Sequence, residues 1–109
     1  LFDLALNFNQ LTGAIPSEVG SLQNLTIFNI YRNRFSGSIP THLANCQNLN
    51  VLDLRNNKGI EGMIPSELGK LSSLCYLHTC STGITGSIPS EICNLRKFNL
   101  KMLTSPLKN

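Results

Sequence analysis

The chain has 109 residues, of which 41% are hydrophobic and 14% are charged, a composition that excludes an intrinsically disordered chain. Its nine Lys and Arg residues against six Asp and Glu give a net charge of +3. This is far short of the dense basic stripe of a nucleic-acid-binding protein. No apolar run in the sequence approaches the roughly 20 residues of a membrane-spanning helix.

A repeated pattern covers almost the whole chain, and each unit opens with apolar residues in an L-x-x-L-x-L spacing. A polar residue follows three positions after the last of them. In chain order these residues are Leu1, Leu4, Leu6 and Asn9; Leu25, Phe28, Ile30 and Asn33; Leu49, Leu52, Leu54 and Asn57; and Leu74, Leu77, Thr79 and Thr82. The alternating L-x-L part predicts a short strand with its leucines turned inward. Because one unit cannot bury these side chains alone, stacked units should form a parallel sheet.

The polar residues Asn9, Asn33 and Asn57 fall where each predicted strand turns away from the sheet. A buried amide there can bond backbone groups of its own unit and of the adjacent unit. We therefore predict a structural asparagine ladder through the stack. Thr82 should continue it more weakly through its hydroxyl group.

The second half of each unit carries a G-x-I-P segment, and the isoleucines recur at spacings of 24, 25 and 24 residues. Glycine allows a backbone path that is closed to larger residues, and proline ends the extended segment. The segments that follow predict short helical or 3-10 turns over Ser17–Leu22, Thr41–Cys46, Ser66–Leu71 and Ser90–Leu95. Their inward residues should be Val19, Leu43, Leu68 and Ile92, followed by Leu22, Cys46, Leu71 and Leu95.

The complete unit, L-x-x-L-x-L-x-x-N-x-L-x-G-x-I-P, resembles the plant-type class of leucine-rich repeats. The resemblance implies an α/β solenoid, a right-handed superhelix with a parallel β-sheet on the concave face and short 3-10 or helical turns on the convex face. We predict one array over residues 1–109, with units of about 1–24, 25–48, 49–73 and 74–97 and a partial unit 98–109. Without an N-terminal cap the first unit would expose its core, so we expect the array to be truncated there.

The pattern breaks at three places. The third unit has one extra residue, which predicts a one-residue bulge at Lys58-Gly59. The fourth unit has Thr79 and Thr82 in place of an inward leucine and the ladder asparagine, and Lys101 stands where a later inward leucine belongs. Either the solenoid ends here, with the tail Leu103–Asn109 over its open edge, or the chain is cut before a cap. We favour weakening combined with truncation. These last units also resemble, more loosely, secreted repeat proteins of diatoms and related algae.

Strand residues that alternate with the inward ones should form columns on the concave face. The four columns are Asp3, Ile27, Val51 and Tyr76; Ala5, Asn29, Asp53 and His78; Asn7, Tyr31, Arg55 and Cys80; and Phe8, Arg32, Asn56 and Ser81. The family resemblance implies that ligands bind this face, and Tyr and Arg are favoured at binding hot spots. The candidate partner-binding residues are Ile27, Asn29, Tyr31, Arg32, Val51, Asp53, Arg55, Asn56, Tyr76 and His78. The alternative is that Asp53 and Arg55 are solvated charges on a polar face.

Metal, disulfide and catalytic chemistry are poorly supported by the sequence. His78 and Cys80 share a face but Cys75 points the other way, so we predict no metal site. Cys46 replaces a buried leucine and lies two units from Cys93, too far for a disulfide. Of the four cysteines, Cys80 is the one that we most expect to form a disulfide, and a partner outside this chain is one option. An open sheet offers neither enclosure nor an oxyanion hole, so we predict no catalytic residue and no cofactor.

Function follows from the repeat class. Similarity to the ectodomains of plant receptor-like kinases implies a non-enzymatic, extracellular or cell-surface module for a protein or peptide ligand, with a co-receptor as a further partner. Nucleic acid is not an expected partner, and membrane attachment would come only through segments outside this chain. Asn24-Leu25-Thr26 is an N-glycosylation sequon, which predicts a glycan on Asn24.

The alternative function is a secreted inhibitor of a cell-wall-degrading enzyme, or a wall-associated structural protein. A membrane helix and a kinase downstream would favour the receptor. A cysteine-rich cap followed by a stop codon would favour the inhibitor or the wall protein.

Overall fold

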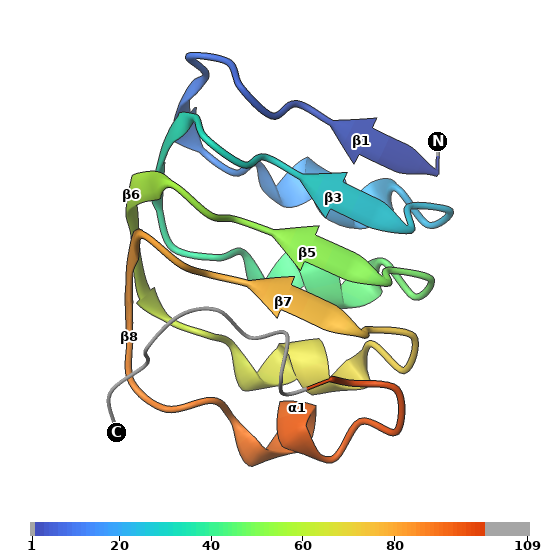
Figure 1. Cartoon of the computed structure of the whole chain (residues 1–109). Helices are drawn as coiled ribbons and strands as arrows, with labels where there is room; N and C mark the ends of the chain where they lie inside the picture. The colour runs from blue at the N-terminus through green and yellow to red at the C-terminus, as the bar shows by residue number, and fades with distance from the viewer. Residues whose placement is uncertain (1, 100–109) are drawn as a thin grey trace.

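The computed structural model describes residues 2–99, which form four stacked coils with one strand of each coil in each of two sheets (Figure 1). A short helical turn completes each coil, as the sequence predicts. In chain order the elements are β1 (Asp3–Ala5), β2 (Thr12–Ala14), η1 (Ser17–Ser21), β3 (Ile27–Asn29), β4 (Arg34–Gly37), η2 (Thr41–Asn45), β5 (Val51–Asp53), β6 (Asn57–Met63), η3 (Ser66–Lys70), β7 (Tyr76–His78), β8 (Thr82–Thr85) and α1 (Ser90–Cys93). The first three turns are 3-10 helices and the last is α-helical.

The first sheet has the strand order β1-β3-β5-β7, and all of its pairings are parallel. Its register places Asp3, Ile27, Val51 and Tyr76 in one column and Ala5, Asn29, Asp53 and His78 in the next, as predicted. The coils lie closer together here than at the helical turns, where they fan apart (Figure 1). This sheet is therefore on the inner, concave side, and the α/β solenoid prediction is confirmed. We call it the concave sheet.

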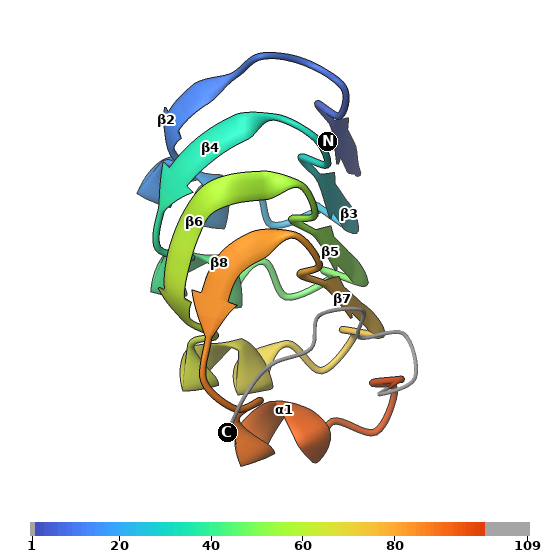
Figure 2. The same cartoon turned by 60° about the vertical axis from the view of Figure 1, so that its left-hand side comes forward.

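A second parallel sheet, with the order β2-β4-β6-β8, forms where each coil turns toward its helical segment (Figure 2). The sequence predicts these segments as extended but does not reveal that they pair. Their pairing follows from the stack, because the concave strands already hold successive coils at the spacing that backbone hydrogen bonds require. The Arg34 amide, for example, donates to the Leu11 carbonyl oxygen at 2.8 Å.

The predicted one-residue bulge is confirmed in β6. Two pairs show the regular register of the second sheet, in which the partner is the residue directly after a ladder position. Thr12 of β2 pairs with Arg34, directly after Asn33, and Glu61 of β6 pairs with Gly83, directly after Thr82. Between them, Ser36 of β4 pairs with Gly59, two residues after Asn57. The extra residue is thus accommodated at Lys58-Gly59, and the regular register resumes in the next coil.

The core lies between the two sheets and the helical turns and consists of equivalent side chains stacked coil on coil. Leucines at the three inward positions of the third coil, Leu49, Leu52 and Leu54, are fully buried. Leu22 and Leu95, predicted to be buried, are only half-buried. They belong to the first and last described turns, where a neighbouring coil is present on one side only.

The asparagine ladder joins each coil to the preceding one through backbone groups. The Asn33 amide nitrogen donates to Leu6 O at 2.8 Å and to Ile30 O at 3.1 Å, and its oxygen accepts from the Leu11 amide. Asn57 repeats this arrangement one coil later and is completely buried.

At the two ends of the ladder the bonds stay within one coil. Asn9 is exposed, and its partners within the described part of the chain are Leu6 O and Asn7 O. The Thr82 hydroxyl donates to Thr79 O at 2.7 Å, and among residues 2–99 it bonds no group of the preceding coil. The predictions made for Lys101 and for the tail Leu103–Asn109 lie outside the described residues.

Candidate ligand-binding site

Most of the candidate residues lie on the exposed face of the concave sheet. The register brings Asn29, Asp53 and His78 side by side across three strands. Seven candidates are half-buried, with part of each side chain open to a ligand: Ile27, Asn29, Tyr31, Val51, Arg55, Tyr76 and His78. The face therefore presents aromatic, amide and guanidinium groups together.

Aromatic rings and guanidinium groups form a continuous pile across the first three coils. The guanidinium carbon of Arg55 lies 4.8 Å from the centre of the Tyr31 ring, a cation–π contact. Tyr31 meets Phe8 edge to face, with ring centres 5.1 Å apart, and the guanidinium carbon of Arg32 lies 5.5 Å from the centre of the Phe8 ring. Such mutual packing restricts the rotamers of side chains that would otherwise be flexible, so the surface is preorganised for binding.

Asp53, a predicted partner-binding residue, lies in the outward-facing column but is only 5% exposed. Arg55 covers it with two hydrogen bonds, from Nε to Oδ1 at 2.9 Å and from Nη2 to Oδ2 at 2.6 Å, and the Arg55 amide also donates to Oδ1. The hydrogen bond to Asp53 raises the pKa of Arg55, against an opposing effect of desolvation. Asp53 and Arg55 are thus a bidentate ion pair, not two solvated charges, and Asp53 acts by orienting Arg55.

The fourth predicted column turns away from the sheet face onto its rim. Phe8, Arg32, Asn56 and Ser81 have left-handed backbones with φ between 58° and 63°. An extended strand would alternate inward and outward at this point, but the left-handed residue ends the alternation one position before the ladder residue. Arg32 and Asn56 are consequently exposed rim residues and not part of the sheet face.

His78 packs against Tyr76 with nearly parallel rings, at an interplanar angle of 10° and with centres 6.3 Å apart. Its Nδ1 atom is buried and has no hydrogen-bond partner among the described residues. Desolvation lowers the pKa of His78 below 6.5; Asp53 opposes this shift and Arg55 adds to it. The imidazole is therefore held in its neutral form more strongly than in the unfolded chain.

We expect the free energy of unfolding to decrease as the pH falls from about 7 to about 5. Between the lowered pKa of folded His78 and its ordinary value, the unfolded chain binds a proton that the folded chain does not, so stability is present above this window and is lost below it. Urea denaturation at several pH values will measure the slope. His78→Asn should reduce the slope, whereas His42→Asn, on the exposed η2 turn, should keep it. Equal slopes of unfolding free energy against pH for both variants would contradict the assignment of this pH dependence to His78.

The cysteines do not gather into one cluster. Cys46 is buried and its thiol donates to Val19 O at 3.3 Å, and burial raises its pKa. Cys75 lies at the start of the fourth coil, where its sulfur accepts from the Asn50 amide nitrogen at 3.1 Å. All four cysteines are free thiols, and residues 2–99 contain no group of three metal-ligating side chains.

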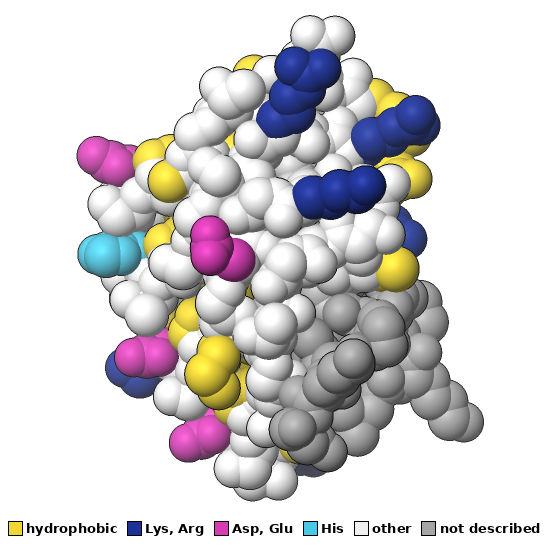
Figure 3. Space-filling model, turned by 90° about the vertical axis from the view of Figure 1, so that its left-hand side faces the viewer, with side chains coloured by type: hydrophobic (Ala, Val, Ile, Leu, Met, Phe, Trp, Pro, Cys, Tyr) yellow, Lys and Arg dark blue, Asp and Glu magenta, His cyan; other side chains and the backbone are white. Residues whose placement is uncertain are grey.

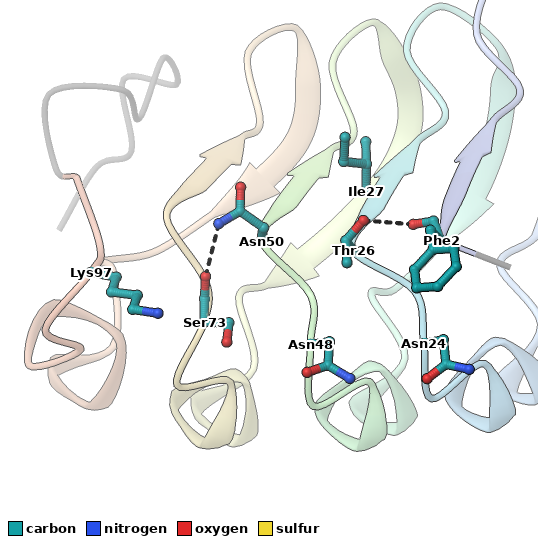
Figure 4. Close-up of a pocket in the computed structure, with 8 residues that line it drawn as sticks. All are labelled: Phe2, Asn24, Thr26, Ile27, Asn48, Asn50, Ser73 and Lys97. Atoms are coloured by element: carbon teal, nitrogen blue, oxygen red, sulfur yellow. Dashed lines mark hydrogen bonds between the residues drawn. The ribbon is translucent and has the colours of Figure 1, made fainter.

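An open groove runs across the starts of the concave strands (Figure 4). Its polar lining includes the exposed sequon residue Asn24, and the Thr26 hydroxyl donates to Phe2 O at 2.8 Å beside it. The lining residues are Phe2, Asn24, Thr26, Ile27, Asn48, Asn50, Ser73 and Lys97. The position of Asn24 at the margin of the solenoid leaves it accessible to modification, which remains a prediction from the sequon.

Arg34 and Lys58 were not identified from the sequence, although they lie beside Arg32 at the rim. They line a hollow of about 590 Å³ together with Arg32, Asn33, Asn56, Gly59 and Ser81. The signal for them was present, because each directly follows a ladder asparagine in adjacent coils. No helix among residues 2–99 has the length and apolar character needed to cross a membrane.

A sequence model of the leucine-rich repeat family matches residues 24–46 and 48–71, whereas no curated protein sequence matches the chain. Among solved structures, the PEPR1–AtPEP1 complex is similar over 91% of this chain, with 44% identity and a TM-score of 0.87. The plant peptide hormone receptor RGFR1 in complex with RGF2 is similar over 98%, with 31% identity and a TM-score of 0.85. The ectodomain of the Arabidopsis receptor kinase HAESA, in complex with an IDA peptide hormone, is similar over 91%, with 37% identity and a TM-score of 0.84.

The chain spans only 14%, 20% and 17% of the length of these three proteins. The likeness therefore concerns the repeated scaffold and not the complete proteins. The fold that they share is a recognition module without catalytic machinery. With the repeat model on its central coils and these likenesses along most of its length, the chain belongs to the plant-type leucine-rich repeat family.

Proposed function

We propose that the chain is the ligand-recognition part of an extracellular or membrane-anchored leucine-rich repeat protein and binds a peptide or protein through its concave sheet. The observation that carries this proposal is the pile of Phe8, Tyr31 and Arg55, fixed from beneath by buried Asp53. A bidentate ion pair, a cation–π contact and an edge-to-face ring contact hold these groups on an open face before any ligand arrives. Preorganised Tyr and Arg side chains are the usual anchors of binding hot spots.

The similar structures support a peptide as the ligand. PEPR1, RGFR1 and HAESA were each solved with a peptide partner, and HAESA also with the co-receptor SERK1. A co-receptor is therefore part of the proposal, as is a location at the cell surface. Neither the groove at the strand starts nor the free cysteines favour the inhibitor or the wall protein over this function.

Selection from a library of random peptides displayed on phage tests the proposal. The full chain should enrich related sequences, and Tyr31→Ala combined with Arg55→Ala should weaken the binding of the enriched peptides by at least about tenfold, since hot-spot truncations exceed about 1.4 kcal/mol. Met63→Ala combined with Arg96→Ala, at exposed residues away from the concave sheet, is the control and should bind normally.

Thermal unfolding of both double variants shows whether they remain folded. Tyr31 is only half-buried, but removal of Arg55 leaves the buried Asp53 carboxylate without its ion-pair partner, so we expect this variant to unfold at a lower temperature while staying folded at the temperature of the binding assay. A folded Tyr31/Arg55 variant that binds the enriched peptides as tightly as the original chain would exclude the concave sheet as the ligand site.

A further inference from the structure

A group of three basic side chains lies beside the concave sheet, on the side of the solenoid that carries β4 and β6. Arg32, Arg34 and Lys58 are exposed and surround the hollow described above, and we call these three residues the basic ledge. Lys and Arg side chains gather on one part of this face, whereas most Asp and Glu side chains lie toward its opposite edge (Figure 3). The ledge is therefore a local concentration of positive charge in a chain of modest net charge.

The repeat geometry brings the three side chains together. Arg34 and Lys58 directly follow the ladder residues Asn33 and Asn57, and their strands, β4 and β6, are paired from Ser36 and Gly59 onward. Lys58 is also the inserted residue of the β6 bulge, and bulges often re-aim side chains at functional sites. The left-handed backbone of Arg32 turns its side chain toward the same rim.

Glycine at the bulge, in the lining of the hollow, lets β6 lie close to β4. A Cβ atom on Gly59 would lie 3.0 Å from the Phe35 carbonyl oxygen and 3.1 Å from the Ser36 side chain. Polar side chains of Asn56 and Ser81 complete the lining. The hollow thus combines cations with neutral hydrogen-bonding groups, a combination that suits an oxyanion.

None of the three cations is neutralised within the described chain. Over residues 2–99 the ion pair between Arg55 and Asp53 is the sole salt bridge. Exposed like charges placed close together contribute nothing to folding, but they create a positive potential that attracts anions. The cluster is therefore better explained by binding than by stability.

We propose that the basic ledge binds the carboxylate groups of an acidic peptide segment whose neighbouring residues lie on the concave sheet. The two surfaces are continuous, because the Arg32 guanidinium lies over Phe8 and Phe8 packs on Tyr31. This inference rests on the proposed function and adds the ligand class to it. Arg34 and Lys58 supply the charge, and Arg32 joins the ledge to the aromatic pile.

Titrations followed by NMR on the full ¹⁵N-labelled chain test the ledge. The probes are an acetylated and amidated tetraglutamate peptide and the tetraglutamine peptide of the same form. Tetraglutamate should shift the amides of Arg32, Arg34 and Lys58 saturably and bind more weakly as salt rises from about 20 to about 200 mM. Tetraglutamine should not bind. Shifts confined to other surfaces would overturn the proposal.

A charge-matched pair of variants separates the ledge from net charge. Arg34→Gln with Lys58→Gln should weaken tetraglutamate binding at least about tenfold, because hydrogen bonds to charged groups are lost. Arg96→Gln with Lys70→Gln removes the same charge from exposed sites elsewhere and should have little effect. Equal weakening by both variants would show non-specific attraction and overturn the proposal.

Each of the remaining outcomes overturns either the ledge proposal or the proposed function. If trigalacturonate binds the ledge more tightly than tetraglutamate, the ligand is an acidic saccharide and the peptide proposal is wrong. If the ledge variant retains full affinity while Tyr31→Ala with Arg55→Ala abolishes selection of phage peptides, the ledge fails and the proposed function stands. If the concave variant selects peptides normally, the proposed function fails independently of the ledge.

Discussion

Replacing Asn57 by alanine is expected to lower the free energy of unfolding by about 3 kcal/mol, because several buried backbone groups lose their partner together. The side-chain amide nitrogen of Asn57 donates hydrogen bonds to Ile30 O at 2.9 Å, Leu54 O at 3.1 Å and Arg55 O at 3.2 Å. Its oxygen accepts from the Phe35 amide at 3.0 Å. The side chain is fully buried, so water cannot easily replace these bonds. Urea denaturation followed by circular dichroism will measure the loss.

The position of each asparagine in the stack predicts an order of effects. Asn33→Ala should cost roughly 1–3 kcal/mol, since its amide also bridges two coils at a slightly more exposed site. Asn9→Ala should cost less than about 0.5 kcal/mol because Asn9 is exposed and bonds only its own coil. An unchanged midpoint for Asn57→Ala, or a larger loss for Asn9→Ala, would refute the ladder as a connection between coils.

Thr82 offers the converse experiment. Its hydroxyl serves only its own coil, so Thr82→Asn would place an amide where a bridge to the preceding coil is missing. We expect this variant to gain about 1 kcal/mol, the value of a typical added hydrogen bond. A loss of stability would show that the fourth coil is shaped around threonine.

The periodic part of the structure could be predicted because each repeat residue has one geometric task. The spacing of Ile15, Ile39, Ile64 and Ile88 sets the length of each coil, and this length sets the register of the concave strands. The spacing of 25 residues between Ile39 and Ile64, one more than in the other units, likewise predicted the bulge at Lys58. Leucines at the inward positions leave few alternative folds, since no other arrangement of the coils buries their side chains.

The parts that could not be predicted depend on contacts between coils. The identities of Phe8, Arg32 and Ser81 do not indicate a left-handed backbone, and only Asn56 belongs to a residue type that favours it. Alternation alone therefore put Arg32 on the sheet and left the ledge unrecognised. Asp53 was expected to be open because its column faces outward, but burial depended on how the Arg55 side chain folds back. Such effects arise from neighbouring side chains and not from the period.

The stacked design also predicts that position along the solenoid, and not residue type, decides the cost of losing a core leucine. Leu52 is fully buried and pairs in register with Phe28 on one side and Leu77 on the other. Leu52→Ala should therefore leave a cavity and lower the free energy of unfolding by about 4 kcal/mol, toward the upper part of the range for such substitutions. Urea denaturation with its m-value will show whether the change affects the folded core or the cooperativity.

Leu4 is the matched control, because it occupies the equivalent inward position in the first coil but pairs on one side only. It is half-buried and lines an apolar hollow of about 310 Å³ at the N-terminal end of the stack. Leu4→Ala should cost about 1 kcal/mol, since little is removed from a closed core. Equal losses at the two positions would mean that coils are stabilised separately. A large difference would mean that each coil depends on two neighbours, and that the concave sheet is most rigid at the central coils, where Tyr31 and Arg55 meet.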